Sequence, residues 1–152
     1  MVEIWSPEIP FDEDAVGRVT PRQPGVYRFL QSEAYPRYRD RTRVLKIGMS
    51  RTDLRSEIWN HFRRHAAANR LSRIRRNAAV VITVEFAVTS AVDAVEIERQ
   101  LLREFEDRHW DLPLLNSTRG YARGEDMHFG ADSSGSGQDM TAEAKEEACR
   151  RR

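Results

Sequence analysis

The 152 residues of this sequence are enough for one domain with a single hydrophobic core and too few for two. No apolar stretch approaches the roughly 18 residues of a membrane span, which excludes an integral membrane protein. The acidic opening MVEIWSPEIPFDEDAV lacks the basic and then apolar start of a secretory signal, and the lone cysteine, Cys149, has no disulfide partner. We therefore expect a soluble protein of the reducing cytoplasm.

The net charge of +1 hides an uneven distribution of charge along the chain. Residues 41–76 hold eleven Lys and Arg against only Asp53 and Glu57, a local balance of +9, while residues 1–20 hold five acids against Arg18. A basic segment of this kind is what binding to nucleic-acid phosphates requires. A solvated helix surface explains the same charges equally well, so charge alone leaves both interpretations open.

An acidic extension, residues 1–20, precedes two predicted strands. Pro24 and Gly25 mark the start of the first strand, residues 25–31, whose side chains alternate between two faces. The second strand covers residues 44–49. The arginine- and tyrosine-rich linker SEAYPRYRDRTR between them is too long for a two-residue turn, so we expect a hairpin with an extended loop.

A helix follows, because apolar residues recur every four positions behind a capping residue, Thr52 or Asp53. The apolar positions are Leu54, Ile58 and Phe62. A basic and partly helical segment, residues 69–77, leads to a third strand at residues 80–88. Strict alternation of apolar and other side chains makes this the clearest strand in the sequence.

Ser90 and Asp93 resemble a capping box and begin a second amphipathic helix that continues through about Asp107. The order strand, strand, helix, strand, helix predicts an α+β fold, a three-stranded antiparallel sheet packed with helices, in one domain spanning residues 21–121. Residues 122–152 form a polar tail in which a Ser/Gly-rich stretch precedes charged sequence, and we expect this tail to be flexible.

One acidic residue interrupts the inward-facing stripe of the last predicted helix. By helical spacing the stripe consists of Ala94, Glu98, Leu101, Leu102 and Phe105. A carboxylate at the position of Glu98 must be paired, protonated or bound to a metal, because an isolated buried charge costs several kcal/mol. Acidic residues at such positions are more often structural than catalytic, so the interpretation depends on the motifs elsewhere in the chain.

Several short motifs occur in an order that resembles the GIY-YIG nuclease family. In chain order they are Gly25-Val26-Tyr27, Lys46-Ile47-Gly48, His61, Ile97-Glu98, and Pro113 with Asn116. The two tripeptides resemble the halves of the family signature, with Lys46 in place of a tyrosine, and Glu98 resembles the family's catalytic glutamate. The last pair resembles a closing Pro-x-x-Asn. The resemblance covers residues 21–121 and depends on the ordered set, since each tripeptide alone is weak.

The resemblance implies Mg²⁺-dependent hydrolysis of a phosphodiester, with Glu98 as the ligand of the divalent cation. It implies that Tyr27 orients or deprotonates the attacking water, a difficult task for a phenol of pKa near 10 unless positive charge lies close by. We expect Lys46 to supply that charge from the adjacent strand. His61 would contact phosphate or relay a proton, and Asn116 would hold the Glu98 region or the phosphate by hydrogen bonds.

The sequence also departs from the family pattern. The family's helical arginine falls on Glu57, and the basic residue that often follows the second tripeptide falls on Met49. Loss of an arginine clamp on the phosphate removes several kcal/mol of transition-state stabilisation. Arg51 and Arg55 lie nearby and are candidates to replace it. The candidates to bind the nucleic-acid backbone are Arg51, Arg55, Arg63 and Arg64.

Three hypotheses follow. The first is a Mg²⁺-dependent endonuclease that acts on DNA, in which Glu98 and Tyr27 are central. The second is a nucleic-acid-binding module on the same scaffold whose catalysis is impaired by Glu57 and Met49. The third is a protein-interaction domain without nucleic-acid affinity, which a salt-dependent gel shift separates from the other two.

Overall fold

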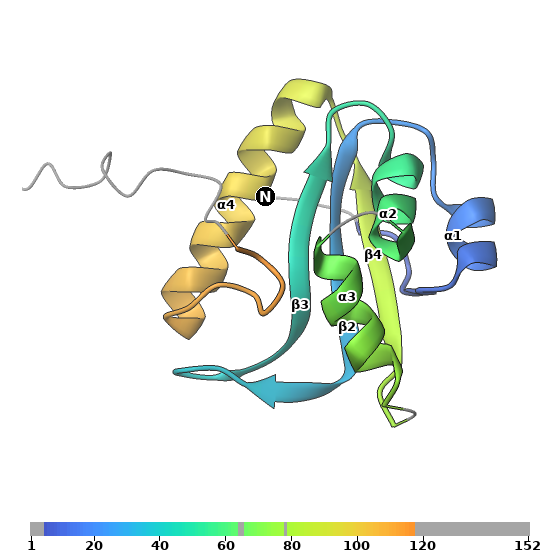
Figure 1. The fold of residues 1–152 in the computed structure, drawn as a ribbon. Coiled ribbons are helices and arrows are strands. Elements are labelled where there is room, and N and C mark those ends of the chain that lie inside the picture. The colour runs from blue at the N-terminus through green and yellow to red at the C-terminus, as the bar shows by residue number, and fades with distance from the viewer. Residues whose placement is uncertain (1–4, 64–65, 78, 118–152) are drawn as a thin grey trace, which may run out of the picture. The chain divides into compact units, whose positions relative to one another are not determined.

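The computed structural model describes residues 5–63, 66–77 and 79–117. These residues form an α+β fold, with one antiparallel sheet of four strands and four helices (Figure 1). The strands lie in the order β1-β4-β2-β3. In chain order the elements are β1 (Ile9–Pro10), α1 (Glu13–Val19), β2 (Gly25–Pro36), β3 (Arg41–Ser50), α2 (Leu54–Arg63), α3 (Ala66–Arg75), β4 (Ile82–Val88) and α4 (Ala91–His109).

The sheet has one strand more than the three we predicted, and the extra strand comes from the acidic N-terminal segment. β1 pairs with β4, with Ile9 opposite Val84. Phe11 and Val16 from the same segment are buried in the core, at 4% and 0% exposure. The acids that suggested a solvated extension begin α1 instead: the side chain of Asp12 caps it by accepting from the backbone N–H of Ala15.

The hairpin of β2 and β3 is longer, and its loop shorter, than we predicted. Pairing continues to Pro36 and Arg41, so most of the expected loop is strand. Residues 37–40 make the connection, and the N–H of Arg37 donates to the carbonyl of Asp40 at 2.8 Å. A register shift near Leu30 interrupts the pairing, and such irregularities hide a strand from alternation-based prediction.

The helices lie on both sides of the sheet, with α4 on one face and α1, α2 and α3 on the other (Figure 1). The core beneath α2 includes Tyr27, Phe29, Leu54 and Ile58. The core beneath α4 is made by other strand residues, Val26 and Ile47 among them, packed with Ala94, Leu102 and Phe105. Strand β3 is an edge strand, so its outer side is where side chains from the two faces can approach each other.

The predicted helix starts are confirmed. Asp53 accepts a hydrogen bond from the N–H of Ser56 at the start of α2. Ser90 accepts from the N–H of Asp93 at 3.1 Å and donates its hydroxyl to the carboxylate of Asp93, which is the predicted capping arrangement at α4. None of the helices in the described part of the chain is long and apolar enough to cross a membrane. The predicted tail, residues 122–152, lies outside the described residues.

Candidate active site

Tyr27 lies in the centre of the sheet, opposite a glycine on the neighbouring strand. The register pairs Tyr27 with Gly48. A Cβ atom on Gly48 would lie 2.5 Å from the Tyr27 hydroxyl oxygen, so the phenol ring lies directly over the glycine. The tyrosine is 1% exposed and packs against Phe29 with ring centroids 5.3 Å apart. The two signature-like tripeptides therefore meet, and the glycine of the second makes room for the tyrosine of the first.

The hydroxyl of Tyr27 is buried among polar groups of α2. It lies 2.6 Å from Nε2 of His61 and 3.5 Å from Oε1 of Glu57. Glu57 and His61 are one helical turn apart, with 3.8 Å between Oε1 and Nε2. The three side chains form a buried triangle in which only Glu57 is substantially exposed, at 31% of its side chain against 2% for His61.

The environment of Tyr27 keeps its hydroxyl protonated. Burial raises the pKa of Tyr27 well above its usual range, and the carboxylates of Glu57 and Glu98 raise it further. The register places Lys46 opposite Phe29 rather than opposite Tyr27. The positive charge that we expected to lower the phenol pKa therefore does not offset burial, and Tyr27 is a neutral hydrogen-bonding group.

Lys46 lies on the same face of the sheet as Tyr27. Its partner on β2 is Phe29, two residues after Tyr27, and residues two apart on a strand point to the same face. Burial lowers the pKa of the Lys46 ammonium group, while the carboxylates of Glu98 and Glu57 act in the opposite direction. Because this ammonium group is half-buried, it is partly shielded from bulk water, and its interactions with anions are correspondingly strong.

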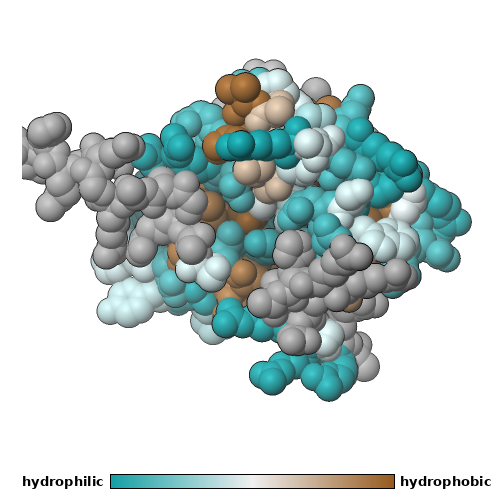
Figure 2. Space-filling model, turned by 45° about the horizontal axis from the view of Figure 1, so that its top comes forward, coloured by the Kyte–Doolittle hydropathy of each residue, from teal (hydrophilic) through white to brown (hydrophobic). Residues whose placement is uncertain are grey.

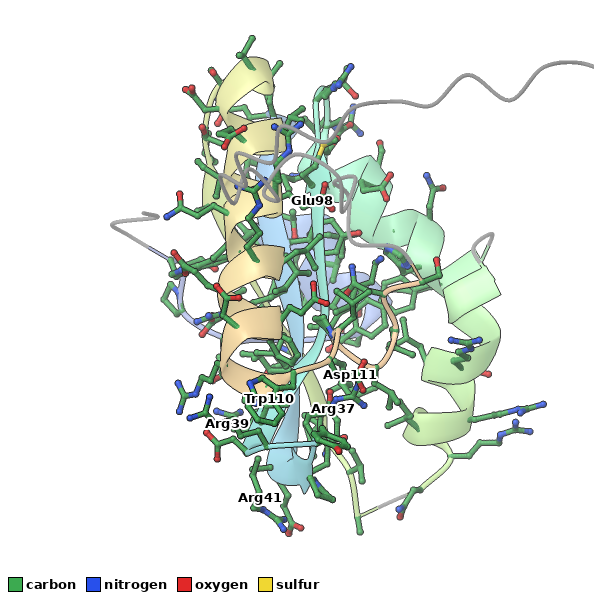
Figure 3. All side chains as sticks on the ribbon, turned by 90° about the vertical axis from the view of Figure 1, so that its left-hand side faces the viewer. Arg37, Arg39, Arg41, Glu98, Trp110 and Asp111 are labelled. Atoms are coloured by element: carbon green, nitrogen blue, oxygen red, sulfur yellow. The ribbon has the colours of Figure 1, made fainter. Side chains whose placement is uncertain are left out.

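Glu98 reaches this cluster from the other face of the sheet. It lies on α4 between the buried residues Ala94 and Leu102, and is itself half-buried. Figure 3 shows Glu98 on the flank of α4 that borders the edge strand β3. Burial raises the pKa of Glu98, the nearby ammonium group of Lys46 lowers it, and Glu57 raises it. The carboxylates of Glu98 and Glu57 act on the pKa values of both Tyr27 and Lys46, so these two carboxylates lie within electrostatic reach of both groups.

Asn116 fixes the chain after α4 against the outer side of β3. Its side-chain amide donates to the carbonyl of Ile47 at 2.8 Å, and its side-chain oxygen accepts from the N–H of Ile47 at 3.0 Å. The N–H of Leu115 donates to the carbonyl of Leu45. Asn116 therefore completes the backbone pairing of the edge strand beside Lys46, which is a positioning contact.

The four candidate arginines differ in what the structure says of them. Arg51 is exposed in the connection between β3 and α2. Arg55 donates from Nε to the carbonyl of Thr20 at 2.7 Å, so part of its guanidinium group anchors the end of α1. Arg63 ends α2, but its side chain is not among those described, and Arg64 lies outside the described residues. Of Arg51 and Arg55, the two whose side chains are described, Arg51 is the more exposed to phosphate.

The carboxylates of Glu98 and Glu57 suit a cation whose remaining coordination positions are filled by water or by a bound substrate. Among the residues that the structure describes, no group of three or more His, Cys, Asp and Glu side chains is placed to hold a metal ion. Mg²⁺ commonly binds through one or two carboxylates, several waters and substrate phosphates. Glu98, with Glu57 in electrostatic reach, fits a cation of this kind and does not fit a metal held by protein alone.

Two contributors to the cluster were missed or misread in the sequence. Glu57 was interpreted only as a position where the family's arginine is absent. Its spacing places it on one helical face with Leu54, Ile58 and His61, and this face points toward the sheet. Gly48 was noted only as part of a tripeptide, and its role depends on a strand register that no local pattern gives. No protein-family model, curated protein or solved structure matches the chain.

Proposed function

We propose that this protein is a metal-dependent endonuclease that hydrolyses phosphodiester bonds in DNA. The proposal rests on the electrostatic coupling of half-buried Glu98 on α4 to half-buried Lys46 on β3, on the sheet face that holds the buried Tyr27–His61 pair. A half-buried carboxylate with a raised pKa next to a half-buried ammonium group costs stability, and such arrangements are concentrated at functional sites. The motif order that resembles GIY-YIG nucleases supports the same reading.

Each member of the cluster has a role in this proposal. Glu98 holds a divalent cation, Mg²⁺ by its ligand chemistry, which would polarise the scissile phosphate and stabilise the leaving oxygen. Lys46 contacts a phosphate oxygen and balances its charge. Glu57 is the accessible carboxylate beside the Tyr27 hydroxyl and takes the proton of the attacking water. Tyr27 and His61 are buried and contact the Glu57 carboxylate, and in this proposal they hold it in place.

The activity is tested with supercoiled plasmid. The purified protein is expected to nick plasmid DNA in Mg²⁺ and to stop when EDTA is added, and its DNA affinity is expected to fall steeply as salt rises, because phosphate contacts release counterions. DNA binding without nicking at any divalent cation would contradict the enzyme. Absence of salt-dependent binding would contradict both nucleic-acid hypotheses and leave a protein-interaction domain.

The Glu57→Gln variant tests the role given to Glu57. The rate of nicking is expected to fall by about 10²- to 10⁴-fold, the usual contribution of a general base. Because the Glu57 carboxylate raises the pKa of Glu98, its removal lowers that pKa, and the acidic limb of the remaining pH–rate profile moves to lower pH. The measurement is plasmid nicking from pH 5 to pH 9. An unchanged rate and profile would remove Glu57 from the mechanism.

An impaired nucleic-acid-binding module is the second candidate, and one observation favours it. Glu57 places negative charge within 3.5 Å of the Tyr27 hydroxyl, where the family resemblance calls for an arginine that faces phosphate. The Glu57→Arg variant separates the two readings. A gain of nicking would show that Glu57 is what impairs catalysis in a nucleic-acid-binding module. A fall in the nicking rate as large as that of Glu57→Gln agrees with the enzyme.

A further inference from the structure

Two large aromatic side chains are exposed at the end of the molecule away from Glu98. Tyr38 lies in the β2–β3 connection and is 80% exposed, and Trp110 follows α4 and is 62% exposed. Their rings stack, with centroids 6.0 Å apart and planes 30° from parallel. Residues far apart in the sequence thus present a pair of flat apolar surfaces to solvent, which a soluble domain rarely does without a binding partner.

The backbone of Trp110 is unfavourable for a tryptophan. Its φ of 58° and ψ of 24° are left-handed, the conformation in which a glycine usually ends a helix. Among the described non-glycine residues only Trp110 has a positive φ. A bulky residue at such a position is strained, and strain of this kind is often retained for function. Glycine would fit this backbone better than tryptophan does, so Trp110→Gly removes the side chain and relieves the strain.

The aromatic pair is surrounded by arginines. The guanidinium carbon of Arg39 lies 5.2 Å from the centre of the Trp110 ring. Arg37 donates to the carboxylate of Asp111 and to the carbonyl of Leu112, which ties the hairpin to the end of α4. Arg108 donates to Asp40. Figure 3 shows Arg37, Arg39, Arg41, Trp110 and Asp111 gathered at this end of the molecule. Arg39 stands out as an exposed cation directed at the ring.

We propose that this aromatic–arginine surface, Tyr38, Arg39 and Trp110, binds an unpaired nucleobase of a single-stranded nucleic acid. A base would stack on the aromatic rings, and Arg39 would contact its phosphate; base stacking on aromatic side chains together with an adjacent cation is how sequence-tolerant single-strand sites are built. The exposed positive charge of Arg39 beside the Trp110 ring favours a partner that combines a flat ring with a phosphate.

The surface also suggests a geometry for the substrate, and this step rests on the proposed function. Trp110 follows Glu98 by twelve residues, which is about 18 Å along α4 at 1.5 Å per residue. At about 3.4 Å per nucleotide of a stacked strand, that distance spans about five nucleotides. The proposed nuclease would then cut within about five nucleotides of an unpaired base, at a junction between duplex and single strand.

Binding is tested by fluorescence anisotropy of labelled oligo-dT of about 20 nucleotides and of a duplex of equal length, both in EDTA so that no cutting occurs. The Trp110→Gly variant is expected to lose single-strand affinity by about tenfold or more, since a stacked base contributes at least that much. Its duplex affinity stays within about twofold, and its Tm is unchanged or higher because glycine fits the backbone. Tyr38→Ala also loses affinity, and Tyr38→Phe keeps it.

Three results would overturn the proposal: wild-type affinity in Trp110→Gly, an equal loss for duplex and single strand, or a concentration-dependent dimer that Trp110→Gly abolishes, which would make the surface a contact between copies. If binding depends on Trp110 but the protein never nicks DNA, the single-strand site stands and the proposed nuclease is rejected. If the protein nicks DNA but binding does not depend on Trp110, the nuclease stands and the single-strand site is rejected.

Discussion

Replacing Glu98 with Gln is expected to reduce Mg²⁺-dependent nicking by at least about 10³-fold. The substitution keeps the size and most hydrogen-bonding capacity of the side chain and removes the charge that would hold the cation. Cation-assisted stabilisation of the leaving oxygen is worth several kcal/mol, and each 1.4 kcal/mol is a factor of ten in rate. The measurement is the initial rate of plasmid nicking at saturating Mg²⁺ for wild type and variant purified in parallel.

The same variant is expected to fold as well as the wild type or better. Burial raises the pKa of Glu98, so the folded state binds a proton more tightly than the unfolded state does. Ionisation of this carboxyl therefore lowers stability as pH rises from its unfolded pKa through its raised folded pKa, and the cost is complete once the pH exceeds the folded pKa. Glutamine carries no charge and avoids this cost, so Tm at pH 7.5 should not fall.

Glu96→Gln is the matched control for this experiment. Glu96 is on the same helix, but its side chain is 66% exposed and its ion pair with Arg99 is a surface pair of little energetic value. Its nicking rate is expected to equal that of the wild type. Equal nicking by wild type and Glu98→Gln would place the chemistry elsewhere in the chain or in a contaminant, and a Tm loss in Glu98→Gln would assign Glu98 a structural role.

The sequence predicted most of the framework of this site because the relevant signals are local. Alternation identified the strand that carries Tyr27, helical spacing placed Glu98 on an inward stripe, and Ser90 marked the start of its helix. The predicted stripe is confirmed at Ala94, Leu102 and Phe105, which are buried. These features depend on a few neighbouring residues each, so a single sequence contains them.

The parts that could not be predicted depend on partners distant in the chain. Strand β1 has two residues and no periodicity of its own, and pairing with β4 defines it. The bulge near Leu30 determines that Lys46 pairs with Phe29, and no local pattern reveals it. Glu57 was compared with an arginine of a family rather than with its own helix face, and its contact with Tyr27 followed only from three dimensions.

The surface over the start of α4 is largely hydrophilic, with a smaller group of apolar side chains (Figure 2). Val92 is 81% exposed there and lines, with Arg51, Ala91, Val95 and Glu96, a hollow of about 490 Å³. Arg51 is thus both a candidate phosphate contact and part of a partly apolar hollow.

Gly48→Ala is expected to have the largest effect on stability and to remove activity together with it. The added Cβ would lie 2.5 Å from the Tyr27 hydroxyl oxygen and 2.6 Å from Cζ, closer than real contacts allow. The phenol ring can move away only by giving up its packing, because it is 1% exposed and in contact with Phe29 and His61. Overpacking of this kind costs about 1–3 kcal/mol, which lowers the Tm of a domain of this size by roughly 5–10 °C.

The effect on activity follows from the same contact. Tyr27 can relieve the clash only by leaving His61, whose Nε2 lies 2.6 Å from its hydroxyl, and Glu57 then loses the support beneath it. Nicking by folded Gly48→Ala, measured well below its Tm, should therefore fall by about 10²-fold, since a displacement near 1 Å in a catalytic site has that effect.

Gly17→Ala is the control: its Cβ would lie 3.2 Å from the Trp59 ring, in a helix where alanine is favoured, and Tm and nicking should be unchanged. A Gly48→Ala protein that keeps its Tm would show that the ring has room to move, and one that loses stability but keeps its rate per folded molecule would separate the Tyr27–His61 contact from catalysis.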